Sequence, residues 1–142
     1  MQIRSYEARD EQAVIDLWKT VFPYHEPRNE PARVIRQKLA SGCGLFFVAQ
    51  THRGVVGTVV GGYDGHRGWV YRLAVDPRYR SRGIGAALMS HLERVLARRG
   101  CSKINLQIHG HNAEVSAFYE QLGYRVENRV SMGKAIAGAS DE

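Results

Sequence analysis

A short, basic, glycine-containing segment, Arg80-Ser81-Arg82-Gly83-Ile84-Gly85-Ala86, is the part of the sequence best suited to bind an anion. It lies between a predicted strand that ends at Val75 and a predicted helix that begins near Gly83. The start of a helix exposes backbone N–H groups without partners and carries a partial positive charge. Glycines let a ligand approach that backbone closely, and Arg80 and Arg82 add fixed charge. The segment therefore predicts a pyrophosphate site.

Other phosphate-binding motifs fit this segment poorly. A dinucleotide fingerprint needs a third glycine, where the sequence has Leu88, and an acidic residue about 20 positions further on. Residues 103–107 contain no acid. The pattern G-x-x-x-x-G-K-[ST] is absent from the sequence. The alternative that stays open is a flexible, glycine-containing turn whose arginines are solvated and bind no ligand.

The elements that must position this segment predict a mixed α/β sheet. Strands are expected at Ile3–Tyr6, Leu45–Thr51, Val55–Gly62, Trp69–Val75 and Lys103–Ile108, with further strands from Tyr124 to about Lys134. Helices are expected after an N-cap at Asp10, around Ile35 and Leu39, from Gly83 to Arg99, and from an N-cap at Asn112 to Gly123. Antiparallel hairpins come first, and a strand–helix–strand unit with a parallel pair follows.

Basic residues are concentrated in one part of the chain. The 142 residues include 20 Lys and Arg against 14 Asp and Glu, a net charge of +6. Residues 67–103 hold nine basic and two acidic residues, 9 − 2 = +7, so the rest sums to −1. Such a window favours an anionic partner, either a nucleic acid or a phosphorylated small molecule. No helix-turn-helix, RNP aromatic pair or GxxG clamp supports the nucleic-acid alternative.

Length and composition predict one domain over residues 1–142, with a loose tail from about residue 135. No stretch approaches the roughly 20 apolar residues of a membrane span. The first five residues lack the apolar run of a signal peptide, so a cytoplasmic location is expected. Two cysteines exclude a disulfide scaffold.

Three blocks in order resemble the GNAT superfamily of acetyl-coenzyme A dependent N-acetyltransferases. They are Leu73-Ala74-Val75-Asp76-Pro77, then Arg80 to Ala86, then Asn112 through Phe118-Tyr119 to Leu122-Gly123-Tyr124. The second block matches the family signature Q/R-x-x-G-x-G/A, and the match extends from about Trp69 to Arg125. The sequence is most similar to small bacterial members, including relatives of the ribosomal-protein alanine N-acetyltransferases. The expected fold is a mostly antiparallel mixed sheet with a splayed parallel strand pair and flanking helices.

The resemblance implies how acetyl-coenzyme A is bound. The pantetheine arm is expected between strands 69–75 and 103–108, where it pairs with the backbone as another strand would. The coenzyme-binding residues implied are Leu73, Ala74, Val75, Arg80, Ser81, Arg82, Gly83, Ile84, Gly85, Ala86, Asn112 and Tyr119. Asn112 also fits a plain helix N-cap.

The reaction implied is direct transfer, in which a primary amine of a small molecule or a protein N-terminus attacks the thioester carbonyl. A backbone N–H near Leu73 or Ala74 is expected to stabilise the oxyanion. Tyr119 matches the family's proton donor to the leaving thiolate, although its spacing from Val115 also fits a core residue. Gln107 stands where the ribosomal-protein acetyltransferases have a glutamate base. Other bases considered are His109, His111, Glu26, Asp64 and a water relay, and a missing strong base favours amines of low pKa.

Several further interpretations remain open. The chain is alternatively a non-catalytic acyl-coenzyme A sensor, and a homodimer is possible. His109-Gly110-His111 lacks a third metal ligand, so no metal is expected. The segments Tyr63–Gly68 and Phe22–Pro31 are candidate walls of the acceptor pocket.

Overall fold

The computed structural model describes residues 1–23, 26–110 and 112–136. Its strands, helices and single-turn 3-10 helices (η) are, in chain order, β1 (Gln2–Ser5), η1 (Ala8–Asp10), α1 (Glu11–Val21), η2 (Pro27–Asn29), α2 (Pro31–Ser41), β2 (Phe46–Thr51), β3 (Gly54–Tyr63), β4 (Gly68–Val70), β5 (Ala74–Val75), η3 (Pro77–Tyr79), α3 (Ile84–Arg98), β6 (Ile104–Leu106) and α4 (Ala113–Gln121). Local turn residues and apolar spacing set most of these bounds, as the sequence predicts.

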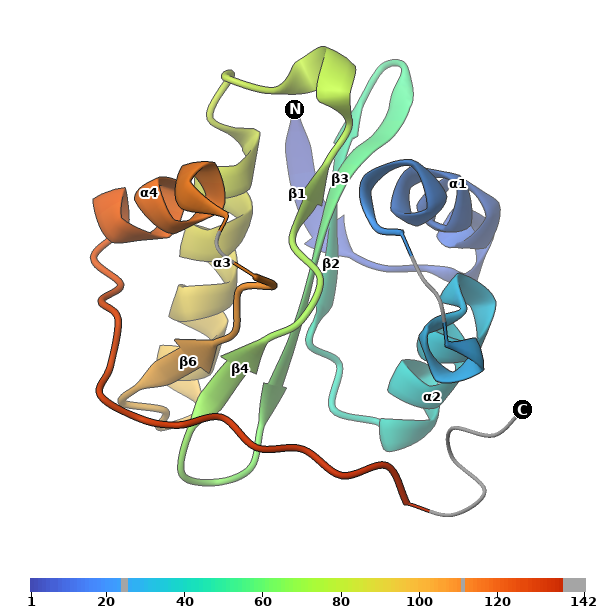
Figure 1. Ribbon diagram of the computed structural model, residues 1–142. Helices are drawn as coiled ribbons and strands as arrows, with labels where there is room; N and C mark the ends of the chain where they lie inside the picture. The colour runs from blue at the N-terminus through green and yellow to red at the C-terminus, as the bar shows by residue number, and fades with distance from the viewer. Residues whose placement is uncertain (24–25, 111, 137–142) are drawn as a thin grey trace.

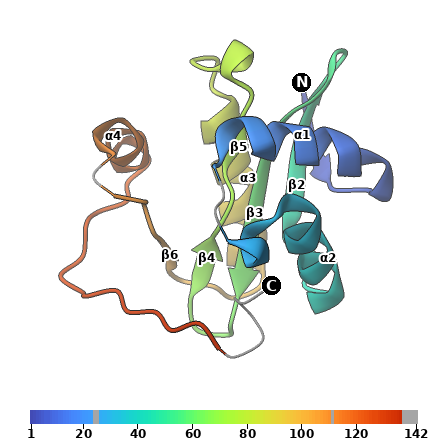
Figure 2. The same cartoon turned by 45° about the vertical axis from the view of Figure 1, so that its right-hand side comes forward.

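One mixed sheet organises the molecule. Its strand order is β1-β2-β3-β4-β6, and β5 pairs with β3. All pairs are antiparallel except β4 and β6, which are parallel because α3 crosses between them. Helices α1 and α2 lie on one side of the sheet and α3 on the other (Figures 1 and 2). The predicted mixed α/β class is confirmed.

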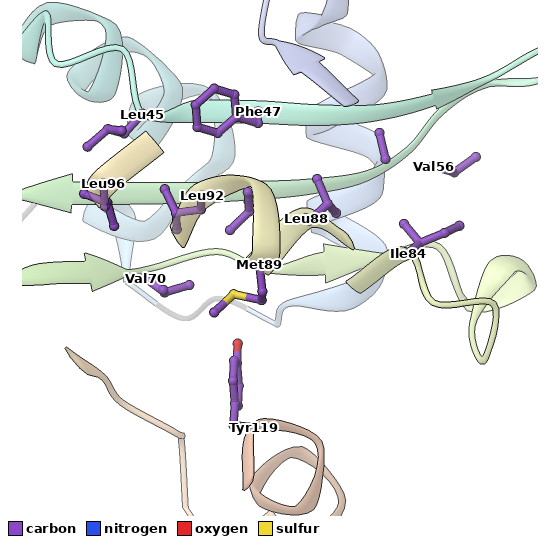
Figure 3. Packing of buried hydrophobic residues seen from close by; sticks show 12 residues of the cluster. Leu45, Phe47, Val56, Val70, Ile84, Leu88, Met89, Leu92, Leu96 and Tyr119 are labelled. Carbon is purple, nitrogen blue, oxygen red and sulfur yellow. The ribbon is translucent and has the colours of Figure 1, made fainter. Parts of the chain in front are cut away.

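The two sides of the sheet bury separate apolar clusters, since neighbouring residues of a strand point to opposite faces. On the α1–α2 side the cluster comprises Val14, Leu17, Trp18, Ile35, Phe46, Val48, Val60 and Ala74. On the α3 side it comprises Leu45, Phe47, Ala49, Val56, Val59, Val70, Ile84, Leu88, Met89, Leu92, Leu96 and Tyr119, most of which Figure 3 labels.

The expected strand Trp69–Val75 is interrupted by a β-bulge. Gly61 of β3 pairs with Val70, and Thr58 pairs with Ala74. Three residues, 71–73, therefore lie opposite two residues of β3, 59 and 60. One extra residue in a strand breaks the ladder and bends the strand, which explains why the strand is divided into β4 and β5.

The expected strands from Tyr124 to about Lys134 are wrong. Residues 124–136 form no strand or helix, and in Figure 1 they cross in front of the lower ends of β4 and β6. Val126, Val130 and Met132 alternate as in a strand, yet they are 87%, 88% and 91% exposed. No layer of the described structure covers them. The segment contacts β6 through polar side chains instead of a backbone ladder.

Asp10 occupies the predicted N-cap position of α1 but does not cap it through its side chain. The carboxylate instead accepts two hydrogen bonds from the Arg4 guanidinium, at 2.8 and 2.9 Å, and one from the Glu7 backbone N–H. Asp10 is only 4% exposed. It therefore ties β1 to the start of α1.

Candidate active site

The β-bulge between β4 and β5 turns two consecutive side chains, Tyr71 and Arg72, toward the α1–α2 side of the sheet. The Tyr71 ring lies over Gly62, and the Arg72 guanidinium lies over the Trp18 ring at 5.1 Å. Leu73, the next residue, packs against the cluster on the α3 side. Bulges commonly re-aim side chains in this way beside functional sites.

The parallel strands part directly after the bulge begins. Their register runs from Gly68 opposite Ile104 to Val70 opposite Leu106 and ends there. Beyond it, β5 pairs with β3 alone among the described strands. This is the splay expected from the sequence, and an extended chain fits between two such strands by adding backbone hydrogen bonds.

Helix α3 begins at this end of the sheet with unpaired amides. Gly83 occupies the N-cap position with φ +79°, a left-handed conformation that suits glycine, and no side chain caps the helix. The first helical hydrogen bond runs from Ala87 N–H to the Gly83 carbonyl. Within the described residues, the N–H groups of 84–86 therefore have no partner, which is the arrangement that a pyrophosphate requires.

The basic residues before α3 are exposed and have different partners. Arg78 pairs with Asp76 at 2.9 Å, so its charge is balanced within the chain. The Arg82 guanidinium stacks over the Tyr79 ring at 5.1 Å, and Arg80 Nε lies 3.4 Å from the Val75 carbonyl. Arg80 and Arg82 form no ion pair with a described carboxylate, so their charge is available to a ligand.

Two residues of this segment have structural features that the sequence did not indicate. Ser81 adopts φ +63°, a left-handed conformation that is uncommon for residues other than glycine. Gly85 is buried, and an ideal Cβ on it would lie 3.1 Å from Phe118 Cζ and 3.7 Å from Val75 Cγ2. The glycine at 85 thus allows α4 to pack closely against the first turn of α3.

Helix α4 carries Tyr119 into the cluster on the α3 side. Tyr119 is 9% exposed, and its hydroxyl is directed toward Met89 (Figure 3). Burial raises the pKa of Tyr119 to about 12. The phenol is therefore neutral at physiological pH and keeps a proton to donate. Asn112 caps α4 by accepting a hydrogen bond from Val115 N–H at 3.1 Å, as predicted.

An open cavity of about 1640 Å³ lies around the edge of the sheet at β6, and its lining includes Leu96 of α3 and Tyr119 of α4. Trp69 of β4 and Asn105 of β6 line it, as do Tyr71 and Gln107, which lie just after these two strands. Residues 125–127 and 129–132 of the C-terminal segment close one side. Of the two walls expected from the sequence, Asn29 and Arg67 contribute to the lining.

The C-terminal segment brings a carboxylate to this cavity. Glu127 accepts a hydrogen bond from Asn105 Nδ2 at 2.8 Å and pairs with Lys103. Hydrogen bonds from Lys103 and Asn105 hold the pKa of Glu127 below its usual range. Gln107 Nε2 donates to Ser131 Oγ. The sequence did not identify Glu127 as a site residue, because its position beside Asn105 depends on how the C-terminal segment crosses β6. The one signal in the sequence was that Glu127 is an acidic residue.

Two of the bases considered from the sequence, Glu26 and Asp64, have partners within the chain. Glu26 pairs with Arg28 at 2.8 Å, and this hydrogen bond holds the pKa of Glu26 below its usual range. Asp64 accepts hydrogen bonds from the backbone N–H groups of Arg67 and His66, which lower the pKa of Asp64 and fix the turn after β3. His109 lines the cavity, and His111 lies outside the described residues.

A mixed sheet with splayed parallel strands beside an uncapped, glycine-preceded helix defines the class of acyltransferases that the sequence resembles. The sequence profile of the acetyltransferase (GNAT) family matches residues 11–124. The chain therefore belongs to this family, and acetyl transfer is the activity class that it shares.

Solved structures carry the same fold. Ard1 from Thermoplasma volcanium is 23% identical, with a TM-score of 0.78 over 89% of this chain and 83% of that one. The ribosomal-protein-S18-alanine N-acetyltransferase from Escherichia coli is 27% identical, with a TM-score of 0.68 over 86% and 76%. PaiA N-acetyltransferase from Thermoplasma acidophilum, solved with coenzyme A, is 20% identical, with a TM-score of 0.78 over 91% and 92%.

None of the helices in the described part of the chain is long and apolar enough to cross a membrane. The described residues also contain no group of three or more His, Cys, Asp or Glu side chains arranged to hold a metal ion.

Proposed function

We propose that the chain transfers an acetyl group from acetyl-coenzyme A to a primary amine by direct attack. The observation that carries this proposal is the parting of β4 and β6 directly beside the unpaired amides of α3. One feature suits an extended pantetheine arm, and the other suits a pyrophosphate at the arm's end. Their adjacency in one site supports a single ligand that carries both groups.

The coenzyme would contact three parts of the chain. The backbone of Leu73–Val75 would pair with the pantetheine arm. The segment Arg80–Ala86 would hold the pyrophosphate through the amides at the start of α3 and the charges of Arg80 and Arg82. The Asn112 side chain, already bound to Val115 N–H, would offer its remaining polar atoms to the arm.

The chemical step forms a bond between the amine nitrogen and the acetyl carbon and breaks the bond between that carbon and sulfur. The proton lost by nitrogen balances the proton gained by the leaving thiolate. A backbone N–H near Leu73 or Ala74 would stabilise the charge on oxygen. Tyr119, neutral because burial raises the pKa of its phenol, would donate to the thiolate.

Apart from His109, the cavity residues considered as bases are poorly suited to deprotonate the attacking amine. Gln107 cannot accept a proton, and the low pKa of Glu127 makes its carboxylate a poor base. Deprotonating a lysine of pKa about 10.4 at pH 7.4 costs about 4 kcal/mol, whereas an α-amine of pKa about 8 is partly neutral. The site therefore favours amines of low pKa, including protein N-termini.

Release of the free coenzyme A thiol from acetyl-coenzyme A, measured over a panel of amino acids, polyamines, small amines and peptide N-termini, tests the proposal. Turnover with at least one amine is expected, and its absence with all of them contradicts the proposal. The variant Arg80→Gln/Arg82→Gln should raise the KM for acetyl-coenzyme A about tenfold, a loss of about 1.4 kcal/mol. The matched variant Arg94→Gln/Arg98→Gln removes the same charge from the other end of α3 and should leave this KM unchanged.

A further inference from the structure

Arg72 places a positive charge beside two residues that line the cavity, Tyr71 before it in the chain and Asn29, to whose carbonyl it donates a hydrogen bond. It belongs to the β-bulge and directly precedes Leu73 of the proposed coenzyme-binding backbone. Its guanidinium lies between two aromatic rings, 5.1 Å from the centre of Trp18 and 5.1 Å from the centre of Phe22. These rings fix the guanidinium on the α1–α2 side of the sheet, next to Asn29 and Tyr71 of the cavity lining.

Arg72 has no carboxylate partner among the described residues. Within the described part of the chain, its guanidinium donates one hydrogen bond, from Nη2 to the Asn29 carbonyl, at a long 3.4 Å. Burial lowers the pKa of Arg72, and no nearby acid opposes this effect. A partly buried cation that is stacked but not ion-paired retains hydrogen-bond donors for a ligand.

The acids nearest in the chain to Asn29 already have partners. Glu26 pairs with Arg28 at 2.8 Å. Glu30 accepts hydrogen bonds from the backbone N–H groups of Ala32 and Arg33, at 2.9 and 3.2 Å, and thereby caps α2. Neither carboxylate is bound to Arg72. The coenzyme's phosphates, in the proposed pose, lie at the start of α3 and not on this side of the sheet.

We infer that Arg72 binds an anionic group of the acceptor, so that the preferred substrates are primary amines that also carry a carboxylate or a phosphate. This inference rests on the proposed N-acetyltransferase activity and specifies its substrate class. The planar guanidinium offers two parallel N–H groups to either anion. Trp18 and Phe22 hold it in place before the acceptor binds, which reduces the entropy lost on binding.

Matched pairs of acceptors test the inference in the wild-type enzyme. β-Alanine is compared with β-alaninamide for the carboxylate, phosphoethanolamine with ethanolamine for the phosphate, and putrescine serves as a cationic amine. In at least one pair the anionic member is expected to give a kcat/KM about tenfold higher, which corresponds to 1.4 kcal/mol. The pair with the larger ratio identifies the anion. Ratios near one in both pairs, or a preference for putrescine, overturn the inference while the transfer itself stands.

Variants separate binding of the anion from a structural role. Arg72→Met keeps an unbranched side chain against Trp18 and Phe22 but removes the charge. It should raise the KM for the anionic acceptor about tenfold, leave kcat and the neutral acceptor unchanged, and be partly rescued in Arg72→Lys. Arg53→Met, in the exposed turn between β2 and β3, is the matched control. If Arg72→Met lowers kcat/KM equally for the anionic and the neutral member of a pair, Arg72 has a structural role and the inference is overturned.

Calorimetry provides a readout that does not depend on turnover. With coenzyme A present, β-alanine or phosphoethanolamine should bind the wild-type protein and bind Arg72→Met about tenfold more weakly. If neither anion binds the wild-type protein, the inference is wrong. If an anion binds in this way but no amine is acetylated, the proposed transfer fails while the anion site remains.

Discussion

The Phe118 ring of α4 fills the space that a side chain at position 85 of α3 would occupy. An ideal Cβ on Gly85 would lie 3.1 Å from Phe118 Cζ and 3.4 Å from Phe118 Cε1. This contact joins α4, which carries Tyr119, to the first turn of α3, which offers its amides. The proton donor and the anion-binding turn of the proposed site are thus held together by one glycine–ring contact.

Gly85→Ala is expected to destabilise the protein by about 1 kcal/mol, because the new methyl group must displace a packed ring. An ordinary exposed helical glycine would instead gain about 1 kcal/mol on the same change. In a Phe118→Leu background the loss should disappear, which gives a coupling of about 1 kcal/mol in a double-mutant cycle measured by urea unfolding. Additive effects would show that the ring and position 85 do not interact.

The local elements of the fold could be predicted from the sequence because their signals lie within a few residues. Apolar spacing indicated α3, and Asn112 indicated the start of α4. The β-bulge at 71–73 could not be predicted, because it exists only in the register between β3 and its partners. The same holds for Gly85, whose neighbour Phe118 comes from another helix. The sequence assigned Gly85 to the close approach of a ligand, and it did not show that Phe118 fills the space beside this residue.

In the C-terminal segment, the alternation of apolar and polar residues wrongly predicts a strand. Val126, Val130 and Met132 have the spacing of a strand face, but alternation predicts a strand only where a layer lies over that face. None does in the described structure. For the same reason Glu127 could not be placed beside Asn105 in advance.

Asp10→Asn is expected to lower the free energy of unfolding by about 3 kcal/mol at pH 7, because it leaves the guanidinium of Arg4 without its buried partner. The hydrogen bond from Arg4 holds the pKa of Asp10 below its usual range. The stabilisation is therefore complete above the unfolded-state pKa of about 3.9 and is lost as the pH falls through the lower folded-state value.

Urea unfolding of the Asp10→Asn variant between pH 2 and pH 7 measures this dependence. The difference from the wild-type protein should shrink below about pH 4. Arg9→Gln, which breaks the exposed pair of Arg9 with Glu7, is the control and should cost less than about 1 kcal/mol. A difference for Asp10→Asn that is independent of pH would exclude the ion pair as its cause.

Cys43 is expected to react as a thiolate near neutral pH. Burial alone would raise the pKa of Cys43, but hydrogen bonds from Lys38, the Leu45 backbone and Ser41 lower it to about 7. The Lys38 Nζ lies 2.7 Å from Cys43 Sγ. The rate of alkylation by iodoacetamide, followed by mass spectrometry, should therefore rise with a midpoint near pH 7.

Lys38→Met should move this midpoint upward and slow alkylation of Cys43 at pH 7 about tenfold, since most of the thiol would then be protonated. Lys19→Met, on the exposed side of α1, removes the same charge without contacting Cys43 and should change nothing. An unchanged midpoint in Lys38→Met would show that the lysine does not stabilise the thiolate.

Tyr119→Phe removes the proposed proton donor and nothing else that the structure records, because no hydrogen bond of the Tyr119 hydroxyl is present among the described residues. We expect kcat to fall about 100-fold on the best amine, with the KM for acetyl-coenzyme A nearly unchanged. The free energy of unfolding should change by less than about 1 kcal/mol. Because the pKa of Tyr119 is about 12, its ionisation should not reduce the wild-type rate up to pH 10.

Tyr124→Phe is the matched control, since it loses a 2.7 Å hydrogen bond to Glu93 and should lose stability without losing kcat. If Tyr119→Phe keeps the wild-type kcat, Tyr119 is a core residue and the thiolate takes its proton from another group.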